Sequence, residues 1–195
     1  MMVNFLLIGL TLLLFVIYRG FNGRNNYLSG RGFLLAALLT ILIGIKYAAT
    51  GWGNLLFAAS SSSLAVNGIL TLVGIGSVYL LRVQRPAFSP RYTGKLFALY
   101  VPMAFAEQVL FLFIVSEIVA ALTGSNIVAA VFTSVYFRAF HQDSYLKRYS
   151  FVLYVAPFVW SMVYLTHGNI IWPSLSMALL GSLYYSFLSD KRVSV

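Results

Sequence analysis

Acidic and imidazole side chains are scarce in this 195-residue chain, so those inside apolar stretches are the first candidates for chemistry. The complete set is Glu107, Glu117, Asp143, Asp190, His141 and His167. Glu107 follows Lys95 by twelve positions in a long apolar segment, which is about 18 Å along a helix. A charged group at that depth in a membrane costs roughly 3 kcal/mol or more unless it is paired or hydrated. Glu107 is therefore a candidate general base or proton-holding group.

The two histidines are predicted to lie near opposite faces of a membrane. His141 ends the apolar segment 126–140, and His167 lies in the turn before the last apolar segment. This separation argues against one haem held between them. Cysteine is absent, which excludes disulfides, thiolate nucleophiles and cysteine-ligated metals. We predict no cofactor; a metal ion, or a haem or pigment on His141 or His167, is the alternative left open.

The elements that position these residues follow from composition. Hydrophobic residues make up 61% of the chain and charged residues 9%, too few charges for a soluble domain and too much apolar content for disorder. Backbone polar groups in hydrocarbon must pair within their own segment, which favours helices of about 20 residues. We predict an all-α, polytopic membrane bundle with about seven transmembrane helices, at 2–18, 32–50, 56–81, 96–122, 126–140, 150–166 and 169–188.

Short connections and loop charges predict how these helices are arranged. The tight turns at 123–125 and 167–169 predict two antiparallel helical hairpins, and Pro102 predicts a kink in the longest span. With seven spans, only Lys46 among the basic residues falls on the far side. The other twelve share one side, namely Arg19, Arg24, Arg31, Arg82, Arg85, Arg91, Lys95, Arg138, Lys147, Arg148, Lys191 and Arg192.

This charge bias predicts an N-terminus outside and a C-terminus in the cytoplasm. The net charge of +9 then reflects orientation and contact with anionic lipids at the cytoplasmic face. Nucleic acid is not a predicted partner, whereas other membrane subunits are. The predicted location is the plasma membrane, an inner membrane or an equivalent one.

Three short motifs in the last four predicted spans carry a family resemblance. They are Glu107-Gln108-Val109-Leu110-Phe111-Leu112, then Phe137-x-x-x-His141, then the segment from Pro173 through Met177 to Gly181. In order and spacing they resemble the CAAX-protease and bacteriocin-processing (CPBP) intramembrane proteases. That family has E-E-x-x-x-R, F-x-x-x-H and H-x-x-x-N at these places, facing a cavity inside the bundle. The resemblance implies a single membrane domain over 1–195, with three spans in 1–95 and a CPBP-like half in 96–195.

Four positions depart from the family pattern. Gln108 replaces the second Glu and Leu112 the Arg, while Met177 replaces the second His and Gly181 the Asn. In the family the Glu is thought to activate water, and the His and Asn to hold that water, a metal or the oxyanion. The resemblance therefore implies Glu107 and His141 as catalytic candidates. It implies Gln108, Phe137, Met177 and Gly181 as binding candidates.

Several functions follow as hypotheses. The first is a CPBP-like protein that has lost proteolysis and serves as a binding or assembly subunit of a membrane complex. The second is an active, divergent intramembrane protease that uses Glu107 and His141, with Asp143 or Glu117 recruited. The third is an unrelated accessory subunit of an energy-transducing or pigment-bearing complex. A transporter ranks last, because the sequence has no inverted repeat.

Overall fold

The structure is a computed structural model, and it describes Leu7, Gly9, residues 41–48, Gly51 and residues 60–81, 89–141 and 151–187. Within these ranges the chain is helical and contains no strand, which confirms the all-α prediction for the described part. The helices are α3 (Ser61–Leu81), α4 (Pro90–Gln108), the π-helix η1 (Val109–Ser116), α5 (Glu117–Thr123), α6 (Asn126–Phe140), α7 (Val152–His167) and α8 (Ile171–Phe187).

The predicted spans coincide with these helices. The span predicted at 126–140 has the bounds of α6, and those at 150–166 and 169–188 correspond to α7 and α8. The span at 32–50 is helical in its described part, 41–48, whereas that at 2–18 lies outside the described residues apart from Leu7 and Gly9. Two helices, Ser61–Leu80 and Pro90–Thr123, are long and apolar enough to cross a membrane.

Polar side chains fix the helix starts, and residues with positive φ form the turns. The Oγ of Ser89 accepts from the backbone N–H of Tyr92, with Pro90 at the first helical position. Ser125 caps α6 in the same way, directly after Gly124 at φ 67°. Asn169, at φ 70°, accepts from the first two backbone N–H groups of α8. These caps place the turns where the sequence predicts them.

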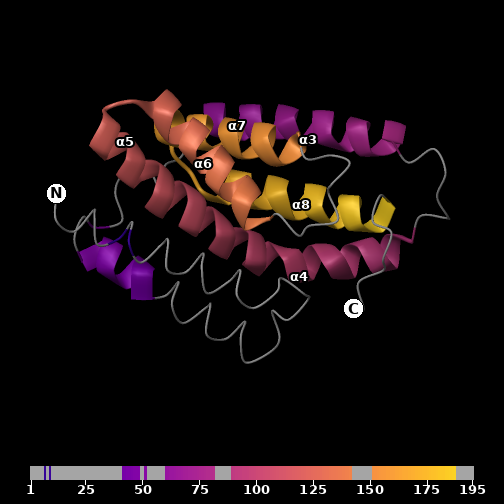
Figure 1. Ribbon diagram of the computed structural model, residues 1–195. Coiled ribbons are helices and arrows are strands. Elements are labelled where there is room, and N and C mark those ends of the chain that lie inside the picture. The colour runs from indigo at the N-terminus through magenta and orange to yellow at the C-terminus, as the bar shows by residue number, and fades with distance from the viewer. Residues whose placement is uncertain are drawn as a thin grey trace.

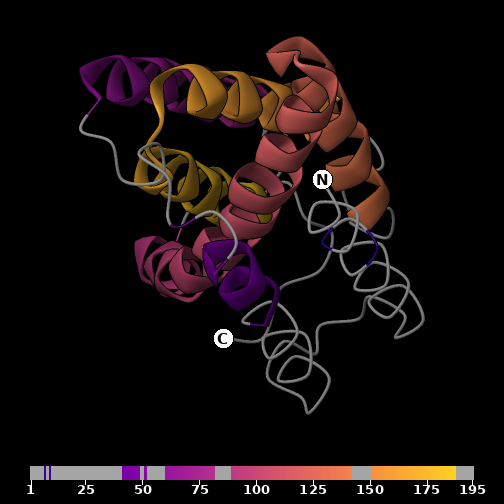
Figure 2. The same cartoon turned by 90° about the vertical axis from the view of Figure 1, so that its left-hand side faces the viewer.

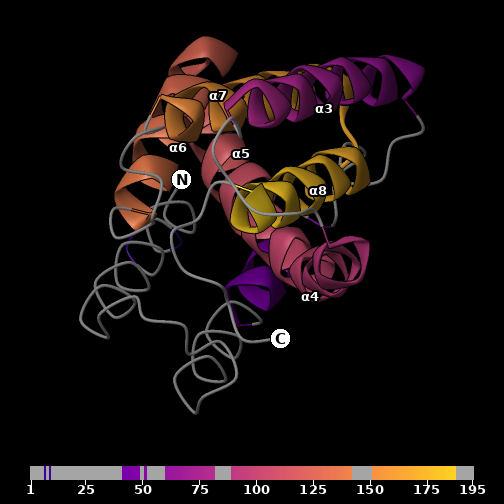
Figure 3. The ribbon, with the colours of Figure 1, turned by 90° about the vertical axis from the view of Figure 1, so that its right-hand side faces the viewer.

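The segments α4, η1 and α5 form one continuous rod of 34 residues, which passes through Pro102 without ending (Figure 1). In Figure 3, α8 lies between α3 and α4, and it packs on both. Helix α6 packs against η1, α5 and α7. Figure 2 shows the same arrangement from the side on which α5 and α6 gather. This continuous helix thus contacts α8 through α4, and it contacts α6 and α7 through η1.

Helices α7 and α8 are joined by the turn at Gly168 and Asn169 and run in opposite directions (Figure 1). They pack chiefly on other helices, since α7 packs on α6 whereas α8 packs on α4 and α3. Helix α3 contacts both α7 and α8. The turn thus predicts the direction of the two helices but not their packing partners.

Small and hydroxyl side chains set the register of α8. Thr71 of α3 donates to Ser176 at 2.7 Å, and one turn later Gly74 lies so close to Leu180 that a Cβ would collide with it. Thr93, near the start of α4, bonds Ser186 at 2.8 Å. Helix α8 therefore runs parallel to α3 and antiparallel to α4. This register brings the middle of α8 opposite the end of α4.

Candidate functional site

Glu107 and His141 meet between two antiparallel helices. Glu107 lies in the last turn of α4 and His141 caps the C-terminus of α6, and both are equally far in sequence from the turn at Gly124. The Oε2 of Glu107 lies 3.4 Å from the Nε2 of His141, and the two side chains are 9% and 16% exposed. The hairpin that starts at Gly124 therefore brings together the two predicted catalytic candidates.

Phe137 fixes the orientation of the imidazole. The Nδ1 of His141 lies 2.9 Å from the carbonyl oxygen of Phe137, and the two rings stack with centroids 4.1 Å apart. Phe111 of η1 packs on the other side of this pair, 4.8 Å from the Phe137 ring. A carbonyl can only accept, so Nδ1 carries a proton and Nε2 faces the carboxylate.

With Nε2 protonated as well, the contact is an ion pair between an imidazolium and a carboxylate, and the pair carries no net charge. Oε2 is buried and forms no hydrogen bond with any described residue, because the 3.4 Å contact is too poorly aligned to count as one. One acceptor of the pair thus remains unsatisfied.

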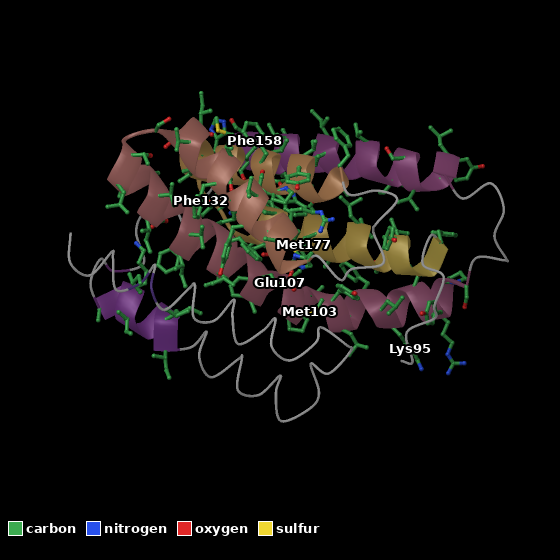
Figure 4. The ribbon with its side chains drawn as sticks, in the orientation of Figure 1. Lys95, Met103, Glu107, Phe132, Phe158 and Met177 are labelled. Atoms are coloured by element: carbon green, nitrogen blue, oxygen red, sulfur yellow. The ribbon has the colours of Figure 1, made fainter. Side chains whose placement is uncertain are left out.

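The third motif, which lies on α8, contacts the end of α4. The Nε2 of Gln108 donates to the Sδ of Met177 at 3.4 Å, and Gln108 is 1% exposed. Figure 4 shows Met177 on α8 across from Glu107 on α4. Gly181, one turn further along α8, faces α4, where an added Cβ would lie 3.3 Å from the Tyr100 ring. A larger side chain at 181 would require that ring to move.

The described side chains around His141 offer few donors for a metal ion or a haem. Among the described residues, no group of three or more His, Cys, Asp or Glu side chains is arranged to hold a metal ion. The Nε2 of His141 faces Glu107 and its ring lies flat against Phe137, so an axial ligand would displace the carboxylate. His167 is exposed at the end of α7, away from this cluster. Asp143 and Asp190 lie outside the described residues.

A second buried charge cluster lies at the other end of η1. The Nζ of Lys46 is 3.0 Å from the Oε2 of Glu117, and the Tyr164 hydroxyl donates to Oε1 at 2.6 Å. Lys46 also lies over the Phe113 ring, 4.9 Å from its centroid. Beside the cluster, Ser116 forms hydrogen bonds with two further hydroxyls, those of Thr133 and Ser161.

Sequence reasoning missed this second cluster. The sequence analysis treats Lys46 only as the single basic residue on the predicted outer side, and Glu117 only as an acid that a divergent protease could recruit. One signal was available in the sequence. Lys46 and Glu117 carry opposite charges, and each interrupts an apolar segment near the same predicted membrane face, which would have predicted an ion pair. No family model matches the chain, and neither the curated proteins nor the solved structures include a significant match to it.

Proposed function

We propose that the chain is a multi-pass protein of the plasma membrane or an inner membrane, with about seven spans, an outer N-terminus and a cytoplasmic C-terminus. Large apolar side chains on the outward faces of α3 and α6 support a lipid environment. Leu72 and Leu80 of α3 are 69% and 72% exposed, and Ile127 and Val135 of α6 are 61% and 54% exposed. Faces of this size on a soluble monomer would drive aggregation.

The positions of the described charges support the orientation. Arg91 and Lys95 lie at the start of α4, and Arg138 lies in the last turn of α6, which packs near the end of α4. All three lie on the side of the bundle away from the turn at Gly124. The turns at Gly124 and Gly168 lie at the opposite end and carry no Lys or Arg. A cytoplasmic location for the basic end follows from the retention of Lys and Arg on that face.

The absence of cysteine from the sequence makes this orientation directly testable. Single cysteines at Asn126 and His167 are expected to react with a membrane-impermeant maleimide on intact cells, because both positions are exposed at the predicted outer end. A cysteine at exposed Arg91 is expected to react only after permeabilisation. Labelling of Arg91→Cys from outside, with protection of the other two, would mean that the orientation is inverted.

The proposed activity is binding, without cleavage, of a membrane-embedded polypeptide by a CPBP-like bundle that acts as a binding or assembly subunit. The observation that carries this proposal is convergence of the degenerate motifs. Glu107 and Gln108 from α4, His141 from α6 and Met177 from α8 meet pairwise at 3.4 Å. The hairpin at Gly124 accounts for the contact of Glu107 with His141, whereas the contact of Gln108 with Met177 joins two helices across 69 residues of sequence.

The chemistry of the substituted positions favours binding over hydrolysis. A hydrolytic site needs a base for the water and donors for the oxyanion, and loss of one oxyanion donor costs about a hundredfold in rate or more. Met177 and Gly181 supply no side-chain N–H or O–H donor at the places where the family has His and Asn. Gln108, in place of the second acid, is occupied by its bond to Met177. The Glu107–His141 pair remains able to hold a proton or to accept a hydrogen bond.

A photo-crosslinking experiment tests the binding proposal. Met177→Cys, carrying a photoreactive maleimide, is expected to give a crosslinked membrane polypeptide in native membranes. Leu72→Cys on the outward face of α3 is the matched control and is expected to give mainly lipid adducts. Equal polypeptide adducts at both positions would contradict a site at Met177. The active-protease alternative predicts instead a cleavage product that disappears in Glu107→Gln.

A further inference from the structure

Two nitrogen atoms of Arg138, near the Glu107–His141 pair, form no hydrogen bond within the described part of the chain. Arg138 lies in the last turn of α6, one turn before His141 and on the same face. Its Nε and Nη1 atoms are buried and form no hydrogen bond with any residue that the structure describes. A guanidinium stays charged at every physiological pH, so Arg138 cannot lower the free-energy cost of its burial by losing a proton. Burial of unpaired charged donors is strongly unfavourable.

The surrounding charges indicate what the partner is. As an ion pair, Glu107 and His141 carry no net charge together, so Arg138 leaves the site with a single positive charge. A phosphodiester carries one negative charge, and its oxygens match the planar guanidinium. The unsatisfied Oε2 of Glu107 favours a group that also offers a hydroxyl donor. These features fit an anionic glycerophospholipid headgroup better than a dianionic phosphate monoester.

The length of α6 brings such a headgroup within reach. The helix has 15 residues, so it spans about 22 Å at 1.5 Å per residue, short of a hydrocarbon core of about 30 Å. A short span is accommodated by local thinning of the bilayer, which draws phosphates towards its end. Basic pockets between helices on the cytoplasmic side are common sites for anionic headgroups. Arg138 is partly exposed as a whole residue, so the site has an open side.

We propose that Arg138, at the cytoplasmic end of α6, binds the phosphodiester headgroup of an anionic lipid with a hydroxyl-bearing headgroup, next to the Glu107–His141 pair. This inference rests on the proposed membrane location. It does not depend on whether the neighbouring pair binds a polypeptide. Arg91 provides a matched control, because it is an exposed arginine at the start of α4, away from the Glu107–His141 pair.

The test is native mass spectrometry of the purified full chain in detergent, titrated with phosphatidylglycerol, phosphatidylcholine or inorganic phosphate. The wild-type chain is expected to bind phosphatidylglycerol about tenfold more tightly than phosphatidylcholine. Arg138→Gln is expected to lose this preference, whereas Arg91→Gln keeps it within about twofold. Arg138→Lys, which keeps the charge but loses the planar fork, is expected to show an intermediate loss.

The result that overturns the inference is unchanged phosphatidylglycerol binding in a folded Arg138→Gln protein. If Arg138→Gln does not fold, equal binding by Arg138→Lys and the wild-type chain overturns it. Displacement of the lipid by millimolar inorganic phosphate would mean a phosphate site and would exclude the lipid. Release of the chain from membranes by alkaline carbonate would contradict the membrane location itself, which separates that failure from a failure at Arg138.

Discussion

Two buried glutamates at the two ends of η1 have opposite surroundings. Both oxygens of Glu117 are occupied, one by Lys46 at 3.0 Å and the other by the Tyr164 hydroxyl at 2.6 Å. Glu107 has only the 3.4 Å contact with His141, and its Oε2 forms no hydrogen bond within the described part of the chain. A satisfied buried carboxylate stabilises its fold, whereas an unsatisfied one retains capacity for a ligand or a proton. This difference supports our proposal of a binding role for Glu107 and indicates a structural role for Glu117.

The π-helix lies between the two glutamates on the continuous helix 90–123. All eight residues of η1 are buried, so it forms the apolar core between the two carboxylates. A π-helix changes the rotation per residue relative to an α-helix, so α-helical spacing misplaces side chains beyond it. Beyond η1, Glu117 faces α7 and residues 41–48, whereas Glu107, before it, faces α6.

The largest expected effect is loss of Lys46. Lys46→Met leaves Glu117 buried without its counter-ion and is expected to lower the free energy of unfolding by about 3–5 kcal/mol. Thermal or denaturant unfolding in detergent measures this change. The double variant Lys46→Met/Glu117→Leu removes both charges and is expected to recover most of the loss. A single variant as stable as the wild-type chain would remove the distinction between the two glutamates.

Tyr164→Phe is expected to have the next largest effect. It removes a hydrogen bond to a charged acceptor and should cost about 1.5–3 kcal/mol of unfolding free energy. The same unfolding assay applies, with Tyr154→Phe as the control because Tyr154 is 44% exposed. If both variants lose the same amount, the 2.6 Å contact does not stabilise the fold.

Glu107→Gln and His141→Gln are expected to have the smallest effects on stability, each within about 1 kcal/mol. The reason is that Oε2 of Glu107 already lacks a hydrogen bond, so little is lost. A double-variant cycle by unfolding measures the coupling between them. Coupling as large as that between Lys46 and Glu117 would contradict our assignment. Crosslinking at Met177, by contrast, should fall in both single variants.

The sequence predicts the local features of the fold well. Apolar segment lengths and the turn residues Gly124 and Asn169 predict the ends of α6, α7 and α8 to within a few residues. Glu107 and His141 are equally spaced about Gly124, so an antiparallel hairpin must bring them close. The family role suggested for these residues stays a prediction.

Features that depend on contacts distant in sequence were not predicted. Lys46 and Glu117 are 71 residues apart, and nothing local indicates which helices bring them together. Likewise, nothing local indicates that α7 packs chiefly on α6 whereas α8 packs on α4 and α3. The π-helix was also missed, because the apolar run 109–115 has the same composition as an ordinary buried α-helix.

The most direct test of the binding role of Glu107 is the length of the polypeptide crosslinked at Met177→Cys. We expect the crosslinked partner to have its full length in the otherwise unchanged protein, because the site binds without cutting. In the variant that also carries Glu107→Gln, we expect less adduct but the same partner length. A shortened partner in the first protein that becomes full-length in the second would show that Glu107 cleaves it, contrary to our account.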